Sequence, residues 1–175
     1  MSPTVAELLE RNRQLAATHE PFPTFSEMSD AGKSPAKIAI VTCIDPRSNP
    51  DRFLGLNPGD ALVIRNVCGH IAPILNDIAA LDVFIGLSDI MVVHHTDCGA
   101  SHFNDSLIRD GLKKRFPSNE DVDTMSFGAI TNIEQSVKDD LTILKKSPLI
   151  SKELGERSVG FVYDIKSGLL TAVEG

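Results

Sequence analysis

The stretch DIMVVHHTDCG, residues 89–99, contains the pattern that decides the fold. Its apolar run, residues 90–93, is rich in β-branched side chains, which is typical of a buried strand in a parallel sheet. The run is followed by His95 and Cys98, a nitrogen and a sulfur side chain of the kinds that bind metals such as zinc. Because ligands bind at the carboxyl ends of strands in open α/β sheets, this strand end is a candidate functional site.

A second predicted strand, residues 37–42, ends in the same way. It runs directly into Cys43, which is followed by Asp45 and Arg47. A single His-x-x-Cys pair is a weak signal, but two strands that each deliver metal-type ligands at their carboxyl ends form a much stronger one. The sequence therefore predicts a catalytic zinc site.

Cys43, His95 and Cys98 supply three ligands for one zinc ion per chain, which leaves one position open for water, as in catalytic zinc sites. A closed structural site remains an alternative if Asp45 fills the fourth position. Alternate residues of an extended chain point the same way, so Arg47 can hold Asp45 by a bidentate contact and keep it off the metal. Zinc-bound water has a pKa of ~7 when the ligands are three imidazoles. Two thiolate ligands should raise this pKa, which predicts an alkaline activity optimum.

The rest of the chain predicts strands that alternate with helices, and hence an α/β fold with a mostly parallel central sheet flanked by helices and an antiparallel C-terminal edge strand. We expect a single domain over residues 1–175, in which residues 1–36 form an N-terminal helix and arm. The helix at 73–87 is apolar on more than one side, so it is either deeply buried or in contact with another subunit. The predicted strands are 37–42, 61–64, 90–93, 159–164 and 169–173; the predicted helices are 4–18, 51–54, 73–87, 101–116 and 131–146; the predicted loops are 22–36 and 117–129.

The composition is that of a globular protein, with 42% hydrophobic and 23% charged residues in a chain of 175. The net charge of −7 argues against nucleic acid and anionic membranes as partners. We find neither a membrane-spanning apolar stretch nor a targeting signal, and three cysteines do not suggest a disulfide framework, so we expect a cytoplasmic protein. A nucleotide-binding protein is disfavoured because the chain has neither G-x-G-x-x-G nor a Walker-type loop.

Three motifs together resemble the β-class carbonic anhydrases: CIDPR at 43–47, RNVCG at 65–69 and HTDCG at 95–99, with a similar C-terminal hairpin sequence, GFVYDIKSGL, at 160–169. The resemblance covers about residues 37–173. It implies the β-carbonic anhydrase fold, zinc on the three residues named above, a catalytic dyad of Asp45 and Arg47, and reversible hydration of CO2 to bicarbonate and a proton by zinc-bound hydroxide. It also implies a homodimer or homotetramer with sites near the subunit interface.

Departures from the family pattern leave alternatives open. Val67 and Cys68 replace a commoner Ala-Gly beside the site, and relatives with narrowed entrances hydrolyse CS2 or COS by the same chemistry. From a different class, a low-activity or non-catalytic zinc-binding or redox protein would use the same cysteines. We expect Cys68 to be a buried thiol.

Four further residues have expected places around the site. We expect Gly99 to offer its N–H to substrate. His94, by strand alternation, should be a hydrogen-bonded core histidine rather than a ligand. His70 and His102 are candidate proton shuttles because an imidazole titrates near ~6.5.

Overall fold

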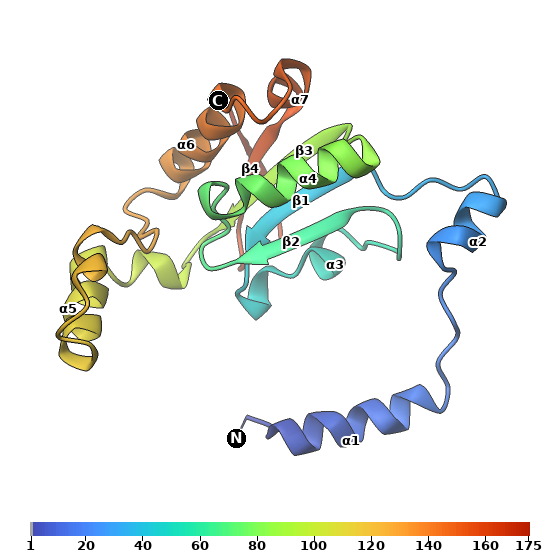
Figure 1. Ribbon diagram of the computed structural model, residues 1–175, viewed down its shortest axis with the longest axis horizontal. Helices are drawn as coiled ribbons and strands as arrows, with labels where there is room; N and C mark the ends of the chain where they lie inside the picture. The colour runs from blue at the N-terminus through green and yellow to red at the C-terminus, as the bar shows by residue number, and fades with distance from the viewer. Residues whose placement is uncertain (1) are drawn as a thin grey trace. The chain divides into compact units, whose positions relative to one another are not determined.

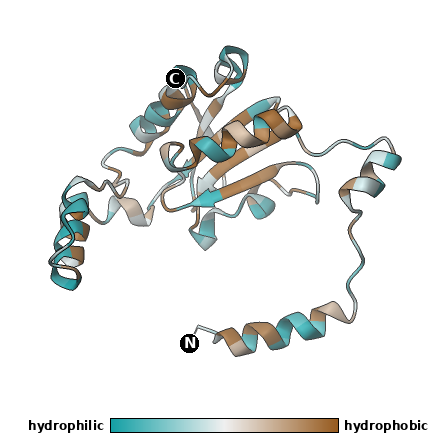
Figure 2. Ribbon diagram, viewed as in Figure 1, coloured by the Kyte–Doolittle hydropathy of each residue, from teal (hydrophilic) through white to brown (hydrophobic). Residues whose placement is uncertain are grey.

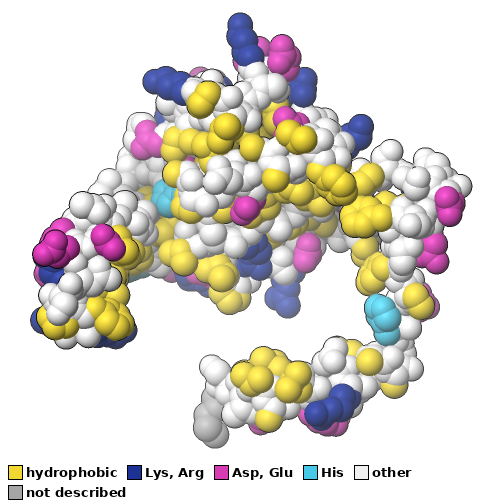
Figure 3. Space-filling model, viewed as in Figure 1, with side chains coloured by type: hydrophobic (Ala, Val, Ile, Leu, Met, Phe, Trp, Pro, Cys, Tyr) yellow, Lys and Arg dark blue, Asp and Glu magenta, His cyan; other side chains and the backbone are white. Residues whose placement is uncertain are grey.

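The computed structural model describes residues 2–175, which divide into two compact units, one ending at Ser34 and one covering Pro35–Gly175. In the first unit, helix α1, Val5–Ala16, begins at a capping box in which the Thr4 hydroxyl accepts a hydrogen bond from the Glu7 N–H. This confirms the helix predicted from residue 4. None of its residues is buried, and hydrophobic side chains are visible along it in Figure 3.

The second helix, α2, Phe25–Asp30, was not predicted. The stretch 22–36 was expected to be a loop because it contains prolines, and this expectation is wrong for six of its residues. The Glu27 carboxylate accepts a hydrogen bond from the Thr24 N–H at 2.6 Å, so a second capping box starts the helix. The Thr-x-x-Glu spacing is the signal that could have located it.

The second unit is built on one five-stranded sheet of order β2-β1-β3-β4-β5 (Figure 1). The first four strands in this order are parallel, and β5 pairs antiparallel with β4 at the edge. The predicted α/β fold class is therefore confirmed. The strands are β1 Ile38–Cys43, β2 Leu62–Asn66, β3 Asp89–His95, β4 Val159–Tyr163 and β5 Leu170–Val173.

Helices in this unit agree with the prediction except at three places. The helix predicted from residue 101 begins at Asp105, because the Asn104 side chain accepts a hydrogen bond from the Leu107 N–H and caps the helix there. The predicted loop 117–129 contains a 3₁₀ turn, and α7 was not predicted at all. The α-helices are α3 Pro50–Phe53, α4 Leu75–Ile85, α5 Asp105–Arg115, α6 Ile133–Lys146 and α7 Lys152–Arg157; the 3₁₀ turns are η1 Pro46–Ser48, η2 Ala72–Ile74, η3 Gly99–Ser101 and η4 Glu120–Thr124.

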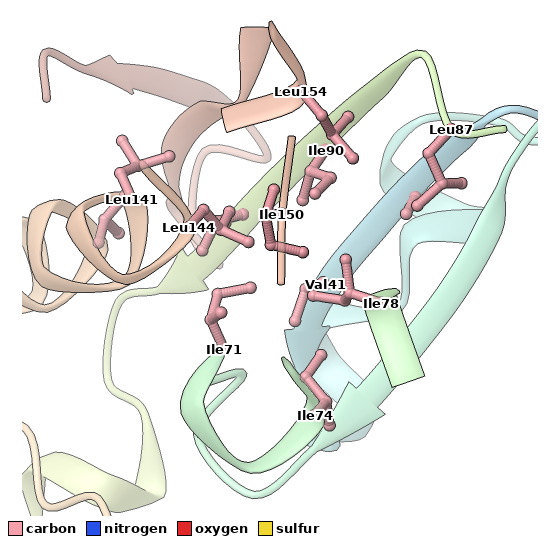
Figure 4. Close-up of a cluster of buried hydrophobic side chains, with 13 residues drawn as sticks. Val41, Ile71, Ile74, Ile78, Leu87, Ile90, Leu141, Leu144, Ile150 and Leu154 are labelled. Atoms are coloured by element: carbon pink, nitrogen blue, oxygen red, sulfur yellow. The ribbon is translucent and has the colours of Figure 1, made fainter. Parts of the chain in front are cut away.

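The main core lies where β1 and β3 meet α4, α6 and α7 (Figure 4). Hydropathic colouring shows the strands of the sheet and α4 as the most apolar elements, whereas α6 alternates (Figure 2). The core cluster consists of Ala39, Val41, Ile71, Ile74, Ile78, Leu87, Ile90, Val92, Val137, Leu141, Leu144, Ile150 and Leu154.

Helix α4 is less buried than its composition suggested. Ile78 is its one buried residue, whereas Val83 and Phe84 are 90% and 74% exposed. The expectation that α4 is deeply buried is thus wrong within the chain, and contact with another subunit stays a prediction. No helix within residues 2–175 has the length and apolar character needed to cross a bilayer.

Core packing through α6 gives a direct test of this architecture. Leu144 is 1% exposed, so we expect Leu144→Ala to lower the free energy of unfolding by about 2–5 kcal/mol through lost burial and a residual cavity. Leu149→Ala, at a side chain that is 54% exposed, is the matched control and should change stability by less than about 0.5 kcal/mol. Urea unfolding measures both free energies, and an equal loss of stability in the two variants would contradict the packing of Leu144 in the core.

Candidate metal centre and active site

Cys43 and Cys98 lie side by side at the carboxyl edge of the sheet. Their Sγ atoms are 3.8 Å apart, and the two side chains are 5% and 1% exposed. Two sulfurs bound to one zinc ion at ~2.3 Å with tetrahedral angles would stand about 3.8 Å apart. The separation of the sulfurs therefore fits a shared metal ion.

His95 completes this group. Its Nδ1–H donates to the Thr96 carbonyl oxygen at 3.0 Å, so its Nε2 carries the lone pair. This Nε2 is buried and has no hydrogen-bond partner, which is unusual for a buried polar atom. The ligand atoms of Cys43, His95 and Cys98 all lie within 4.8 Å of one another. A metal-binding histidine typically donates one ring N–H to a carbonyl and leaves its other nitrogen for the metal, as His95 does. Together with the two sulfurs, this nitrogen forms a donor set that fits zinc.

The local chain path brings the three residues together. Cys43 is the last residue of β1 and His95 the last of β3, and these strands pair in parallel with Thr42 opposite Val93. Asp97 has a left-handed backbone conformation, with φ of 54°, in the turn that leads from β3 to Cys98. Aspartate is one of the few non-glycine residues found there with any frequency, so HTDC can form the tight turn.

Asp45 and Arg47 form the ion pair that the sequence predicted. Arg47 donates through Nε and Nη2 to the Asp45 carboxylate, with the shortest distance 2.7 Å, and its own backbone N–H also donates to Asp45. These contacts lower the pKa of Asp45 to about 2. The Asp45 Oδ2 lies 4.0 Å from the free Nε2 of His95, so an ionised carboxylate faces the metal-type ligands.

Asp97 extends this pair on its other side. Its Oδ2 accepts from Arg47 Nη1 at 2.7 Å and its carbonyl oxygen accepts from Nη2 at 2.9 Å, while its Oδ1 lies 2.8 Å from His102 Nε2. Arg47, and next His102, lower the pKa of Asp97. Sequence reasoning missed this residue, although its place between two candidate ligands could have drawn attention to it.

The two candidate thiol ligands share a proton. The pKa of Cys43 is lowered chiefly because the Cys98 thiol donates a hydrogen bond to it, whereas the pKa of Cys98 is raised because that residue keeps the proton. The Asp45 N–H, 3.5 Å from the Cys43 sulfur, also favours the thiolate. These contacts lower the pKa of Cys43 and so favour its thiolate form.

The remaining predicted residues are more widely placed. Gly99 begins the turn η3 directly after Cys98, with open space where a side chain would be. Cys68 is 1% exposed, which agrees with a buried thiol. His102 is exposed beside Asp97, whereas His70 is hydrogen-bonded to Asp140, which raises the pKa of His70 to about 10. An imidazole that stays protonated to that pH is poorly suited to shuttle protons near neutrality.

His94 lies in the interior, on the side of β3 that faces α6. Its Nε2 is 3.1 Å from Asp140 Oδ2, but the direction is unsuited to a hydrogen bond, and both ring nitrogens lack an aligned partner. The prediction of a core histidine holds, and the predicted hydrogen bond is not formed. Asp140 itself was missed, because nothing in the run KDDL distinguishes a buried acid from a solvent-exposed one.

The sequence and the fold are both similar to those of known proteins. The carbonic anhydrase family model matches residues 38–170. β-Carbonic anhydrase 1 of Mycobacterium tuberculosis is 32% identical over 138 residues, which cover 78% of this chain and 81% of the relative. A carbon disulfide hydrolase of Acidianus is 30% identical over 154 residues, which cover 75% of this chain and 74% of that relative. The crystal structure of a carbonic anhydrase from Streptococcus mutans superposes with a TM-score of 0.82 at 30% identity and covers 99% of this chain and 100% of that one.

The family match covers strands β1 to β4 and both strand ends that carry the candidate ligands, and it ends at the first residue of β5. Relatives and solved structures point to the same family, and two of the named relatives are enzymes of the carbonic anhydrase type. The chain belongs to the β-carbonic anhydrase family and is an enzyme of that family, a carbonate dehydratase.

Proposed function

We propose that this chain binds one zinc ion through Cys43, His95 and Cys98 and catalyses the reversible hydration of CO2 to bicarbonate and a proton. The observation that carries the proposal is the convergence of two sulfurs and an unpartnered histidine nitrogen beside an ionised carboxylate. When bound there, zinc supplies Lewis acidity that makes water a nucleophile near neutral pH.

Asp45 orients the attacking water. Its carboxylate stays ionised because of Arg47, so it can only accept a hydrogen bond. When the water donates a hydrogen to Asp45, the direction of the water's lone pair is fixed. Arg47 is held in turn by Asp97, so the carboxylate has little freedom to rotate toward the cysteines. These contacts favour an open metal site over one that Asp45 closes.

Substrate and product use groups at the edge of the same site. The Gly99 N–H can donate to a CO2 or bicarbonate oxygen, because it lies next to Cys98 at the start of η3. The proton released in each turnover must reach solvent. His102 is the proposed acceptor, because its side chain is 65% exposed and it contacts Asp97, which binds Arg47.

Hydrolysis of CS2 or COS is the second candidate. It is favoured by the similarity to the Acidianus carbon disulfide hydrolase and by the loop beside the site, where Val67 is 62% exposed. Turnover compared on CO2, COS and CS2 with one preparation would decide between the two candidates.

Assembly and location are proposed with the same function. We propose a homodimer or homotetramer, because α1 presents Val5 and Leu15 at 74% and 70% exposure and α4 presents Val83 at 90%. A cytoplasmic location is proposed from the acidic composition and the three free cysteines.

The decisive measurement is stopped-flow CO2 hydration between about pH 6.5 and about pH 9 on protein of known zinc content, since two thiolate ligands favour an alkaline optimum. We expect one zinc per chain and activity that rises with pH. Fully metallated protein that is inert on CO2 but active on CS2 would replace the first candidate by the second.

Asp45→Asn tests the role of the carboxylate. We expect zinc content to remain at one per chain, while kcat/KM for CO2 falls by about 100-fold or more, because an amide can donate as well as accept and no longer orients the water. Asp51→Asn, at an exposed acid on α3, is the control and should leave turnover unchanged. Wild-type turnover in Asp45→Asn would remove this residue from the mechanism.

Cys98→Ser tests the ligand set. A serine hydroxyl is a poor zinc ligand at neutral pH, so we expect less than one zinc per chain after dialysis against a weak chelator, with a matching loss of activity. Cys68→Ser, at the buried thiol outside the group of three, should retain one zinc per chain. Equal zinc content in the two variants would argue against Cys98 as a ligand.

A further inference from the structure

The loop Asn66–Ile71 lies against the end of β1 that carries Cys43. Cys68 and Gly69 both have left-handed backbone conformations, with φ of 72° and 82°. A Cβ atom added to Gly69 would lie 2.9 Å from the Cys43 nitrogen, so loop and strand are in tight contact. A non-glycine residue in this conformation is strained and persists only where the surrounding bonds hold it.

Two side chains hold the loop in place. Asn66 acts from within it, accepting from the Gly69 N–H at 2.9 Å and donating to the His70 carbonyl oxygen at 2.8 Å. Asp140 acts from helix α6: its Oδ1 accepts from the Ile71 N–H at 2.9 Å, and its Oδ2 accepts from His70 Nδ1 at 2.9 Å. One carboxylate from a distant part of the sequence thus binds both final residues of the loop.

His70 and Asp140 form a buried ion pair. The Gly128 carbonyl oxygen, 3.1 Å from His70 Nε2, can only accept, as can the Asp140 carboxylate at Nδ1, so both ring nitrogens carry a proton. Burial raises the pKa of Asp140, but the hydrogen bonds from His70 and the Ile71 N–H, together with the nearby His94 ring, outweigh this and lower it. Asp140 is 2% exposed, so removal of its charge leaves the partly buried His70 imidazolium without its partner.

Asp140 also contacts the strand that carries the histidine ligand. His94 directly precedes His95, and its Nε2 is 3.1 Å from the Asp140 oxygen that binds His70. The two imidazole rings meet edge to face, with their centroids 5.3 Å apart. The carboxylate therefore lies between the loop beside Cys43 and the end of β3.

We propose that Asp140 is a positioning residue for the metal centre: together with His70 it fixes the loop Asn66–Ile71 against Cys43 and so sets the position of the Cys43 sulfur and of the backbone N–H bonded to it. The proposal rests on the proposed role of Cys43 as a ligand. The loop is bonded to the chain directly after Cys43, because the Ile44 N–H donates to the Asn66 carbonyl oxygen at 2.8 Å. The next N–H along this chain, that of Asp45, lies 3.5 Å from the Cys43 sulfur. Hydrogen bonds to a metal-bound sulfur tune the charge it donates to the metal.

The same three side chains allow a competing interpretation. The ligand atoms of His70, His94 and Asp140 lie within 4.8 Å of one another, as a second metal site would require. His70 already donates through both ring nitrogens, so a metal would first have to displace a proton from Nδ1. We therefore favour the ion pair, and metal counting tests that choice.

Cobalt-substituted protein provides the test, with Asp140→Asn compared with Asp139→Asn. Asp139 is the next residue on α6, exposed and bonded to Gln135, so it controls for charge on the helix. In Asp140→Asn we expect one Co²⁺ per chain, a sulfur-to-cobalt charge-transfer band moved to longer wavelength, and kcat for CO2 lowered about tenfold with little change in KM. Asp139→Asn should match the wild type in all four.

The His70→Gln/Asp140→Asn double variant provides a rescue, because two neutral amides can pair and no buried charge is left alone. If the two residues act as a unit, the double variant is less impaired than Asp140→Asn. If Asp140→Asn does not fold, His70→Gln replaces it, and its cobalt spectrum and turnover are compared with those of Asp139→Asn.

Two outcomes would overturn the proposal. If Asp140→Asn is less stable than the wild type but its charge-transfer band is unchanged, Asp140 has a structural role alone. A second Co²⁺ per chain that is lost in this variant would make it a metal ligand. Wild-type protein that is inert on CO2 would defeat the proposed function, while the cobalt spectra would still test the positioning of Cys43.

Discussion

The parallel pairing of β1 with β3 is the constraint on which the site depends. The register places Thr42 opposite Val93, so Cys43 and His95 emerge at the same edge of the sheet although they are far apart in sequence. Both strands are almost entirely buried, and their β-branched side chains fill the space beneath α4 and α6. Burial therefore fixes the register, and the register fixes the distance between the candidate ligands.

Two ion pairs of similar design lie near the strand ends that carry the candidate ligands. Arg47 binds Asp45 in the turn after β1, and His70 binds Asp140 beside the loop after β2. In each, the partner lowers the pKa of the carboxyl group and so favours its ionised form. The pairs differ in exposure: Arg47 is nearly half exposed, whereas Asp140 is 2% exposed and depends much more on its partner.

Much of the fold could be predicted from the sequence because its signals are local. Apolar β-branched runs marked the strands, and the three motifs at strand ends marked the candidate ligands and the pair of Asp45 and Arg47. The misses have physical causes. Helix α2 was missed because prolines flank it, although Thr24 caps it. Helix α4 was expected to be buried because an apolar side chain looks the same in the sequence whether or not another element covers it.

The long-range polar contacts could not be predicted. Asp140 is one of two adjacent acids, and only the packing of α6 on β3 determines which of them faces His70 and His94. Asp97 was passed over because its role arises from a left-handed turn that aims its carboxylate at Arg47. Partners chosen by tertiary packing leave no periodicity in a single sequence.

The position of β3 in the middle of the sheet also sets how an ion held at its end could leave. With β1 bonded along one edge and β4 along the other, the His95 end of β3 cannot fray without breaking two ladders at once. Cys98 lies beyond the strand, on a turn anchored by Thr96, whose N–H donates to the Tyr163 carbonyl oxygen. If Cys43, His95 and Cys98 hold an ion as proposed, we expect it to leave by opening of this turn and of the Asn66–Ile71 loop rather than by unfolding of the sheet, so that metal exchange and global unfolding would be separate kinetic processes.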